Sequence, residues 1–328
     1  MADAAALEAG RVRRAPTKLG IVGAGSVGTS VAYAALIRNS ADHVALFDRQ
    51  SAKVEAEVLD LAHGTQFTGA PQVSGGAEID HLAESDVVVI TAGAKQQPGQ
   101  SRLELAEANA RMMRGLMPSL VACAPDAIFL VVTNPADVLT VVAQRCAALP
   151  PNRVFSTGTV LDSSRLRWML AREAGVAVAS VHAMIIGEHG DSQFPLWSSA
   201  RIGPVPAREW APPGRGRFRP AELDGIAAAV RGAAARVIAG KGATNYAIGL
   251  AAARVVEAVL KDERAVLPVS SILSDYRGLS GIALSVPTVV GAEGVVRVVD
   301  TPMDDQEIAL LHRSAEALRN TVRSMKSA

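Results

Sequence analysis

Short apolar segments alternate with helical patterns along the first half of the chain. Residues 18–22 form an apolar run that is followed by three closely spaced glycines and by an Ala-rich segment, 29–37, suited to a helix. A second apolar run, 43–47, ends at Asp48 and leads into residues 53–61, where apolar side chains recur on one helical face. This alternation of strand and helix predicts a parallel sheet with helical crossovers.

Two later apolar runs differ from the usual pattern of a half-exposed strand. Residues 87–91 and 128–133 are almost continuously apolar and rich in β-branched side chains, which is typical of strands buried on both faces of a parallel sheet. Ligands of open α/β sheets bind beyond the carboxyl ends of the strands. We therefore look for chemistry in the residues that directly follow these four predicted strands.

The second half of the chain carries a mixed pattern. It predicts, in chain order, a helix, a strand, an exposed loop rich in Gly, Pro and Arg, and a long helical region broken at Gly240 and Gly242: 163–173, 180–186, 203–220 and 221–260. Three further apolar runs predict a β-meander with a turn at Gly291 and Gly294: 266–273, 282–290 and 294–299. The last helix is predicted to begin with Thr301 as its N-cap and Pro302 at its first position, and its apolar stripe consists of Ile308, Leu311, Ala315, Leu318 and Val322. These elements indicate a second unit, and we place the division near residue 157.

Composition narrows the class of protein. The chain has 328 residues, of which 49% are hydrophobic and 20% charged, as expected of a globular protein with a sizeable core. A net charge of +1 and an aromatic content of 4% disfavour a nucleic-acid partner. The two cysteines form no CxxC pair and no histidine cluster accompanies them, so we expect neither a disulfide framework nor a metal site.

The same features suggest a cellular location. Residues 1–17 are expected to be a flexible tail. They are not expected to be a signal peptide, because they lack its apolar segment. The apolar runs are far shorter than the ~20 residues that cross a bilayer. We therefore expect a soluble protein in the reducing cytoplasm, without a membrane partner.

The glycines after the first predicted strand fit a dinucleotide-binding turn. In Gly23-Ala24-Gly25-Ser26-Val27-Gly28, the first glycine allows a tight turn, the second lets a pyrophosphate approach backbone N–H groups, and the third packs the helix on the strand. Asp48 ends the next strand about 20 residues later, where a carboxylate can accept hydrogen bonds from both adenosine ribose hydroxyls and repel a 2′-phosphate. We therefore predict NAD rather than NADP as the cofactor, although the neighbouring Arg49 could weaken this preference.

Polar residues are concentrated in two segments of the second half. Residues 162–165 open a predicted helix, and residues 187–191 lie in a loop after a predicted strand. The latter contain His189, whose imidazole suits proton transfer near neutral pH, and Asp162 could orient and charge it. Taken singly, His189 is equally compatible with a structural role, and the acidic residues beside it with capping of the loop.

Two arginines of the first segment's helix point in different directions. Asp162 and Arg165 share one helix face, whereas Arg167 lies ~160° away around the axis. A planar guanidinium can bond a carboxylate twice, so Arg165 is predicted to anchor a substrate carboxylate, with a surface salt bridge as the alternative. Arg102 ends a polar segment, 94–102, of a length that can act as a lid.

Five ordered motifs carry a resemblance to a known family. GAGSVG, AGAKQQPGQSR, TNPADVLT, GTVLDSSR and IIGEHGDS resemble the L-lactate dehydrogenase branch of the lactate/malate dehydrogenase family, and the similarity extends from about Lys18 to the C-terminus. The resemblance implies an α/β fold, with a Rossmann-type doubly wound parallel sheet at 18–157 followed by a mixed α/β substrate domain at 158–328. It also implies reversible hydride transfer between NADH and pyruvate, giving L-lactate, and assembly as a homotetramer.

The resemblance also implies roles for individual residues. His189 would donate a proton to the pyruvate carbonyl with Asp162 as its partner, and Arg165 would bind the substrate carboxylate. Arg102 would close with the lid and polarise the carbonyl. Asn134 would bond near the same oxygen, and Thr244 would form part of the substrate wall. The implied cofactor contacts are Gly23, Gly25, Val27, Gly28, Asp48, Lys53, Gly93 and Asn134.

Gln96 occupies the position that separates the two branches of the family. Malate enzymes carry an arginine there, which neutralises the second carboxylate of oxaloacetate. A neutral amide would leave that carboxylate desolvated without a cation, at a cost of several kcal/mol, so pyruvate is the predicted substrate. Lys95 would weaken this discrimination if it pointed inward instead, and Gln100, where many lactate dehydrogenases have glutamate, makes the lid less acidic.

Arg167 and His182 match a cationic pair that binds fructose 1,6-bisphosphate at a subunit interface in bacterial members of the family. His182 starts the predicted strand that leads to His189, so the resemblance implies an allosteric effector site coupled to the catalytic one. An exposed arginine and an ordinary strand histidine are the alternative. Two other functions stay open for the whole chain: a malate dehydrogenase-like 2-hydroxy acid oxidoreductase, and a non-catalytic NAD-binding sensor.

Overall fold

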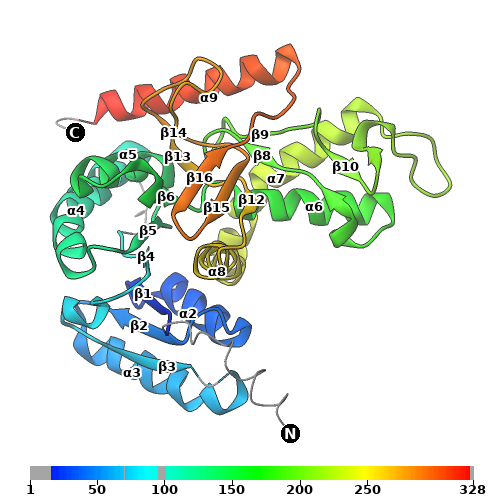
Figure 1. The fold of residues 1–328 in the computed structure, drawn as a ribbon. Coiled ribbons are helices and arrows are strands. Elements are labelled where there is room, and N and C mark those ends of the chain that lie inside the picture. The colour runs from blue at the N-terminus through cyan, green and yellow to red at the C-terminus, as the bar shows by residue number, and fades with distance from the viewer. Residues whose placement is uncertain (1–15, 70, 95–100, 326–328) are drawn as a thin grey trace, which may run out of the picture.

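The strands of the first half are apolar on both faces because they lie in the middle of a three-layered arrangement. The computed structural model describes residues 16–69, 71–94 and 101–325, and it contains an eight-stranded sheet in the order β14-β13-β6-β5-β4-β1-β2-β3 (Figure 1). Its strands are β1 (Lys18–Val22), β2 (His43–Phe47), β3 (Gln72–Gly76), β4 (Val87–Ile90), β5 (Ile128–Val131), β6 (Val154–Ser156), β13 (Ser270–Ile272) and β14 (Ala283–Ser285). Strands β1 to β6 are parallel in the doubly wound order 3-2-1-4-5-6, and β13 and β14 join their edge in antiparallel pairing.

Helices cover both faces of this sheet. One face packs against α2 (Ser26–Arg38), α3 (Ser51–His63) and α8 (Tyr246–Leu260), and the other against α4 (Arg102–Cys123), α5 (Ala136–Ala147) and α9 (Asp305–Ser324). In β4, Val87 and Val89 belong to the apolar cluster that includes α2 and α8, whereas Val88 and Ile90 belong to the cluster that includes α4 and α5. Alternate residues of one strand thus enter different cores, which explains why the run is continuously apolar.

A third apolar core lies outside the large sheet. It is formed by α6 (Val160–Ala174), α7 (Pro220–Lys241) and a small sheet of β7 (Val181–His182), β10 (Arg201–Ile202) and β11 (Val205–Pro206). These elements occupy the right-hand part of Figure 1. The remaining strands pair as β8 (Ile185–Ile186) with β9 (Phe194–Pro195), and as β12 (Ala265–Leu267), β15 (Thr288–Gly291) and β16 (Gly294–Val298).

Most of the predicted elements are present, and the predicted fold class is confirmed. The bounds of β1 and β2 coincide with the predicted runs, and the helices expected around 29–37, 53–61 and 163–173 are one to three residues longer at each end. The long helical region is divided into α7 and α8 at Gly242, one of the two predicted glycines, whereas Gly240 lies within α7. Gly294 makes the predicted turn with a φ of 83°, a left-handed conformation that favours glycine.

Three predictions about the second half are wrong in detail. The strand expected at 180–186 is two strands in different sheets, since β7 pairs with β10 and β8 with β9. The expected meander is divided as well, because β13 and β14 extend the large sheet while β12, β15 and β16 form their own. The loop expected to be exposed at 203–220 contains β11 and the buried side chains of Ala207 and Phe218.

The start of the last helix also differs from the prediction. Asp304, not Thr301, is the N-cap: its carboxylate accepts the Glu307 N–H at 2.9 Å, and the Glu307 carboxylate accepts the Asp304 N–H at 3.0 Å. This reciprocal pair satisfies two backbone donors, which a threonine three residues earlier could not do. The predicted stripe is correct, with Leu311, Ala315 and Leu318 fully buried.

Two further observations on the described residues concern membrane spans and metal sites. None of their helices has the length and apolarity needed to span a bilayer. Nor do three or more His, Cys, Asp or Glu side chains gather, within 16–69, 71–94 and 101–325, in a way that could hold a metal ion.

Candidate active site

The glycine turn between β1 and α2 has the shape that a dinucleotide requires. Gly23 has a φ of 103°, and a Cβ there would lie 2.9 Å from the Ala92 nitrogen. A Cβ on Gly28 would collide with the Gly23 carbonyl oxygen, so this glycine allows α2 to pack on the strand. At Gly25, by contrast, a Cβ would meet no atom within 4 Å. The first and third glycines are therefore needed for the fold, and the second leaves the helix N-terminus open to a phosphate group.

Asp48 lies beside this turn, at the carboxyl end of β2. One carboxylate oxygen accepts the Ala24 N–H at 2.8 Å, and the other accepts the Gln50 N–H at 3.0 Å. These two bonds fix the carboxylate at the edge of the glycine turn while it stays partly exposed. This arrangement fits the adenosine ribose of a dinucleotide.

The other predicted cofactor contacts surround the same end of the sheet. Val27 lies in the first turn of α2, and Lys53 lies near the start of α3 with a half-buried side chain. Gly93 follows β4, and a Cβ there would collide with the Thr133 side chain. The residues present thus fit NAD along the carboxyl edge from β2 to β5.

His189, Asp162 and Arg165 form one connected group. The Asp162 carboxylate accepts a hydrogen bond from His189 Nδ1 at 2.7 Å and one from Arg165 Nη1 at 2.8 Å. The Asp162 side chain is 2% exposed, and those of Arg165 and His189 are 15% and 26% exposed. The structure therefore brings together the imidazole and the guanidinium that the sequence placed on separate segments.

Charge balance within this group changes the acidity of its members. Burial by itself would raise the pKa of the Asp162 carboxyl, but the His189 imidazole and the Arg165 guanidinium outweigh it and hold that pKa below its usual range. Burial would likewise lower the pKa of His189, but Asp162, and then Asp137, outweigh it, so the pKa of the imidazole is raised. The raised pKa favours the protonated imidazole, which is the form that can give a proton.

Long-range hydrogen bonds hold the turn that carries His189. Gly187 exchanges two backbone hydrogen bonds with Ser285, of 2.9 and 3.0 Å. The Glu188 N–H donates to Ser314 Oγ of α9 at 2.7 Å, and the His189 N–H donates to the Asp137 carboxylate of α5 at 2.7 Å. Sequence reasoning assigned no role to Ser285, Ser314 or Asp137, although Asp137 lies within one of the motifs.

Asn134 follows β5, and Thr244 precedes α8. The Asn134 carbonyl accepts from Asn109 Nδ2 at 2.8 Å, and Asn109, a buried residue of α4 missed by the sequence analysis, also accepts the Ala94 N–H at 2.7 Å. The peptide bond from Asn134 to Pro135 is cis. Thr244 is half-buried in the link between α7 and α8, next to Asn245, which donates to Ser30 of α2 at 3.0 Å.

The lid residues are described only in part. Arg102 is the first residue of α4, and its side chain lies outside the description. Lys95, Gln96 and Gln100 also lie outside the described residues.

Arg167 of α6 contacts the residue that follows His182 in the chain. Arg167 Nε donates to the carbonyl of Ala183 at 2.9 Å, and burial lowers the pKa of its guanidinium. His182 is exposed on β7, directly opposite Arg201 of β10. The expected single strand that carries His182 and ends near His189 is wrong, because the chain changes sheets between β7 and β8.

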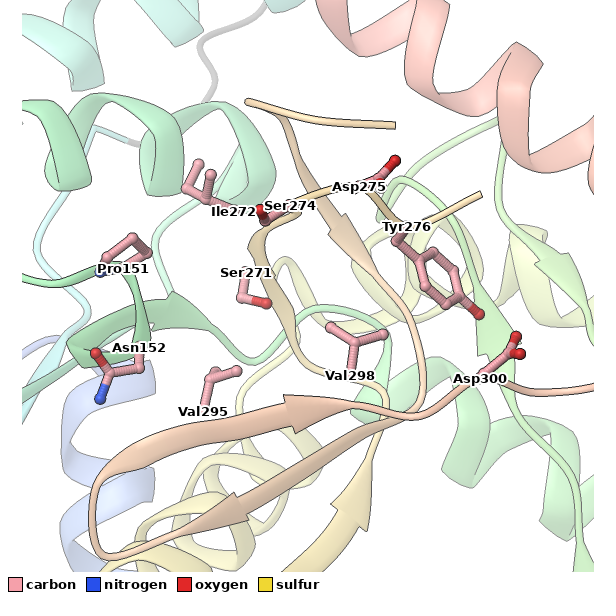
Figure 2. A pocket seen from close by; sticks show the side chains of 10 residues that line it. All are labelled: Pro151, Asn152, Ser271, Ile272, Ser274, Asp275, Tyr276, Val295, Val298 and Asp300. Atoms are coloured by element: carbon pink, nitrogen blue, oxygen red, sulfur yellow. The ribbon is translucent and has the colours of Figure 1, made fainter. Parts of the chain in front are cut away.

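A separate pocket of about 400 Å³ lies away from these groups (Figure 2). Because successive side chains of a strand point to opposite faces, Ser271 of β13 lines this pocket while Ser270 lies near Asp137. Figure 2 shows Tyr276 pointing toward Asp300 at its edge. None of the predicted site residues lines this pocket, so we place the candidate active site at His189 and the glycine turn.

Fold and site together define a class of protein. A doubly wound sheet with this glycine turn, combined with a histidine–aspartate pair beside a guanidinium, is the arrangement of a nicotinamide-dependent dehydrogenase acting on a small carboxylic acid. The model of the lactate/malate dehydrogenase NAD binding domain matches residues 17–156, and that of the α/β C-terminal domain of the same family matches residues 159–328. The chain therefore belongs to the lactate/malate dehydrogenase family, whose members are NAD-dependent oxidoreductases, and the predicted resemblance and cofactor are confirmed.

Individual relatives are similar along their whole length. The chain is 48% identical over 307 residues to an L-lactate dehydrogenase of Bifidobacterium animalis subsp. lactis, covering 93% of this chain and 96% of the relative. It is 45% identical over 306 residues to an L-lactate dehydrogenase of a Synechococcus species, covering 93% and 98%. Among solved structures, the minor L-lactate dehydrogenase from Enterococcus mundtii superposes with a TM-score of 0.91 at 36% identity, covering 96% of this chain and 100% of that one.

Proposed function

We propose that this protein is an L-lactate dehydrogenase, which interconverts pyruvate and L-lactate with NAD as its cofactor. The observation that carries the proposal is the shared carboxylate of Asp162, which bonds both His189 at 2.7 Å and Arg165 at 2.8 Å. One buried group thereby aligns a proton donor with a carboxylate anchor, and a 2-oxo acid needs both within the length of three carbons. The L-lactate dehydrogenases among the relatives support the same assignment.

The proposed division of labour follows from the hydrogen bonds. A carboxylate only accepts, so His189 Nδ1 must donate to Asp162, and Nε2 is the ring nitrogen that can give a proton to the substrate carbonyl. Arg165 uses one of its five donors on Asp162 and keeps a planar edge for the substrate carboxylate. Arg102 is proposed to close over the site and stabilise the negative charge that develops on the carbonyl oxygen. The bound nicotinamide supplies or accepts the hydride.

We further propose that the cofactor is held by the predicted set of Gly23, Gly25, Val27, Gly28, Asp48, Lys53, Gly93 and Asn134, and that residues 18–157 and 158–328 form the two domains. The open space at Gly25 and the fixed carboxylate of Asp48 support the cofactor site. Asn134 and Thr244 are proposed to line the substrate with Arg165.

A steady-state assay tests the proposal directly. NADH oxidation is measured with pyruvate, oxaloacetate and longer 2-oxo acids, for the wild-type protein and for His189→Asn. We expect pyruvate to be preferred and His189→Asn to lose about 1000-fold or more of kcat/KM, because it cannot donate a proton in the transition state. A non-catalytic sensor would bind NADH without turnover in either protein.

Gln96 is proposed to set the preference for pyruvate. Gln96→Arg supplies the cation that a second substrate carboxylate needs, so the ratio of kcat/KM for oxaloacetate to that for pyruvate should rise by about 100-fold or more. Lys95→Ala is the matched control, because its loss should leave the ratio within about threefold if the amide and not the ammonium faces the substrate. An unchanged ratio in Gln96→Arg would overturn this assignment.

The proposed homotetramer is supported by an exposed apolar surface on two adjacent helices. Tyr33 and Ile37 of α2 are 61% and 58% exposed, and Tyr246 and Leu250 of α8 are 73% and 52% exposed. Each pair is four residues apart and so shares one helix face, and such a patch is typical of a protein–protein interface. Analytical ultracentrifugation of wild type and Ile37→Asp tests it: the variant should dissociate at concentrations where the wild type is tetrameric.

The proposed effector is fructose 1,6-bisphosphate, bound by Arg167 and His182. The bond of Arg167 to Ala183, the residue after His182, and the presence of Arg201 opposite His182 support an anion site there. The test is a titration of the bisphosphate at low pyruvate concentration, where KM should fall for the wild type and stay constant for His182→Ala. The proposal also includes a role in fermentation and a location in the cytoplasm, and the two free cysteines support the location.

A further inference from the structure

A second carboxylate lies close to the catalytic imidazole. Asp137 is the second residue of α5, its side chain is buried, and the residue is 2% exposed. Its Oδ2 accepts the backbone N–H of His189 at 2.7 Å. The Asp137 carboxylate thus contacts the backbone of His189 from α5, whereas Asp162 of α6 bonds the imidazole ring.

The position of Asp137 is suited to a negative charge. It lies in the first turn of α5, where the helix dipole and the unpaired N–H groups favour an anion. The fully buried Ser270 of β13 and His189 also favour its charged form. Burial and the nearby Glu188 oppose them, and burial prevails, so that the pKa of Asp137 is raised to about 6. The carboxyl is thus ionised at pH 7 and above, and neutral in mildly acidic solution.

The charged groups around His189 come from each element that packs on it. Asp162 and Arg165 belong to α6, Asp137 belongs to α5, and Glu188 belongs to the turn itself. Asp162 supports the charged imidazole most strongly, Asp137 supports it next, and Arg165 opposes it. Asp162 stays ionised through the working range because its own pKa is lowered, so Asp137 is the member whose contribution changes with pH.

We propose that Asp137 is a positioning residue for the reaction, which fixes the His189 backbone and adds a second negative charge that stabilises the protonated imidazole. The inference rests on the proposed function, since it concerns the proton donor of that reaction. The hydrogen bond to His189 N–H acts at every pH, whereas the charge acts only where the carboxyl is ionised. The two contributions can therefore be separated by measuring activity against pH.

Asp137→Asn is the variant that isolates the charge. Its amide oxygen can still accept the His189 N–H, and its volume is nearly unchanged. For pyruvate reduction, kcat/KM should match the wild type within about twofold near pH 5.5, where the wild-type carboxyl is mostly neutral. It should be about fivefold to tenfold lower near pH 8.5, since an opposite charge a few ångströms away changes a pKa by about one unit or more. A residue with a structural role alone would lower the activity by the same factor at every pH.

Two further variants guard against a folding defect. Ser270→Ala leaves Asp137 in place but removes a group that favours its charge, so the pH at which the Asp137 charge begins to contribute to kcat/KM should rise while the value near pH 9 stays unchanged. Glu257→Gln is the matched control: it neutralises another buried carboxylate, bonded to Arg38 at 2.8 and 2.6 Å, far from the site. It should lower the melting temperature without changing the pH dependence.

The outcomes distinguish this inference from the function on which it rests. Pyruvate turnover by the wild type, with a ratio of Asp137→Asn to wild type that falls with rising pH, supports both. Turnover with a ratio that is constant from about pH 5.5 to 8.5, on either side of the Asp137 pKa, overturns the inference alone. A wild type that turns over no 2-oxo acid overturns the proposed function, and the inference with it.

Discussion

Asp162→Asn is the substitution that tests the geometry of the site most sharply. The wild-type carboxylate has two oxygens, and each faces one donor: His189 Nδ1 at 2.7 Å and Arg165 Nη1 at 2.8 Å. Asparagine offers one oxygen and one NH2 group in the same space. Whichever way the amide turns, one of the two donors then faces another donor inside a site where the side chain is 2% exposed.

The magnitude follows from these two bonds. Losing one hydrogen bond between charged groups costs about 1.5–3 kcal/mol, and the protonated imidazole also loses the charge that stabilises it. A combined loss of about 3 kcal/mol in the transition state corresponds to a decrease of about 150-fold in kcat/KM for pyruvate. We expect most of it in kcat if the amide oxygen stays with Arg165, and most of it in KM if the oxygen stays with His189.

The assay is steady-state NADH oxidation with pyruvate near pH 7, together with NADH binding and a thermal melt. Binding of NADH should be unchanged, because the Asp48 and glycine-turn contacts are remote from Asp162. Asp126→Asn, which makes the same change of charge at an exposed turn, is the control. Values of kcat/KM within about threefold of each other for the two variants would refute the reasoning, because the paired geometry would then carry no energy.

Three further predictions follow from other contacts. Arg165→Lys keeps the charge but loses the planar fork, so the KM for pyruvate should rise by about 100-fold with a smaller decrease in kcat, as measured by initial rates. Asp48→Ala removes the group that accepts the Ala24 N–H and that we propose binds the ribose, so the Kd for NADH should rise by about tenfold in fluorescence titrations while that for NADPH changes less. Glu257→Gln should lower the free energy of unfolding in urea by about 2 kcal/mol, which is less than for a fully buried pair because Arg38 is 40% exposed, and an unchanged midpoint would contradict this role of the pair.

The fold was predictable where the information is local. The runs at 18–22 and 43–47 are apolar, short and bounded by turn residues, so their strands begin and end where expected. The run at 180–186 is similar in composition, yet it is divided, because the backbone of β7 pairs with β10 while that of β8 pairs with β9. Local periodicity contains no information about which distant strand offers a partner.

The site shows the same limit. His189, Asp162 and Arg165 attract notice because their residue types suit proton transfer and carboxylate binding. Asp137 does not, since an acid in the first turn of a helix is an ordinary feature that favours the helix itself. Its contact with His189 lies 52 residues away in the sequence and becomes visible only in three dimensions.

The topology explains why the acids and the base of this site come from different kinds of element. In a doubly wound sheet, helices begin at the carboxyl edge of the strands, and their N-termini stabilise anions. Asp137 and Asp162 both lie in first turns, of α5 and α6, so their burial is partly offset by the helix that carries each of them. A cationic imidazole in such a turn would be destabilised by the same dipole. His189 accordingly lies in a turn outside the helices, and the Asp137 and Ser314 side chains hold that turn. The imidazole can therefore carry a positive charge between two acids without lying at a helix N-terminus.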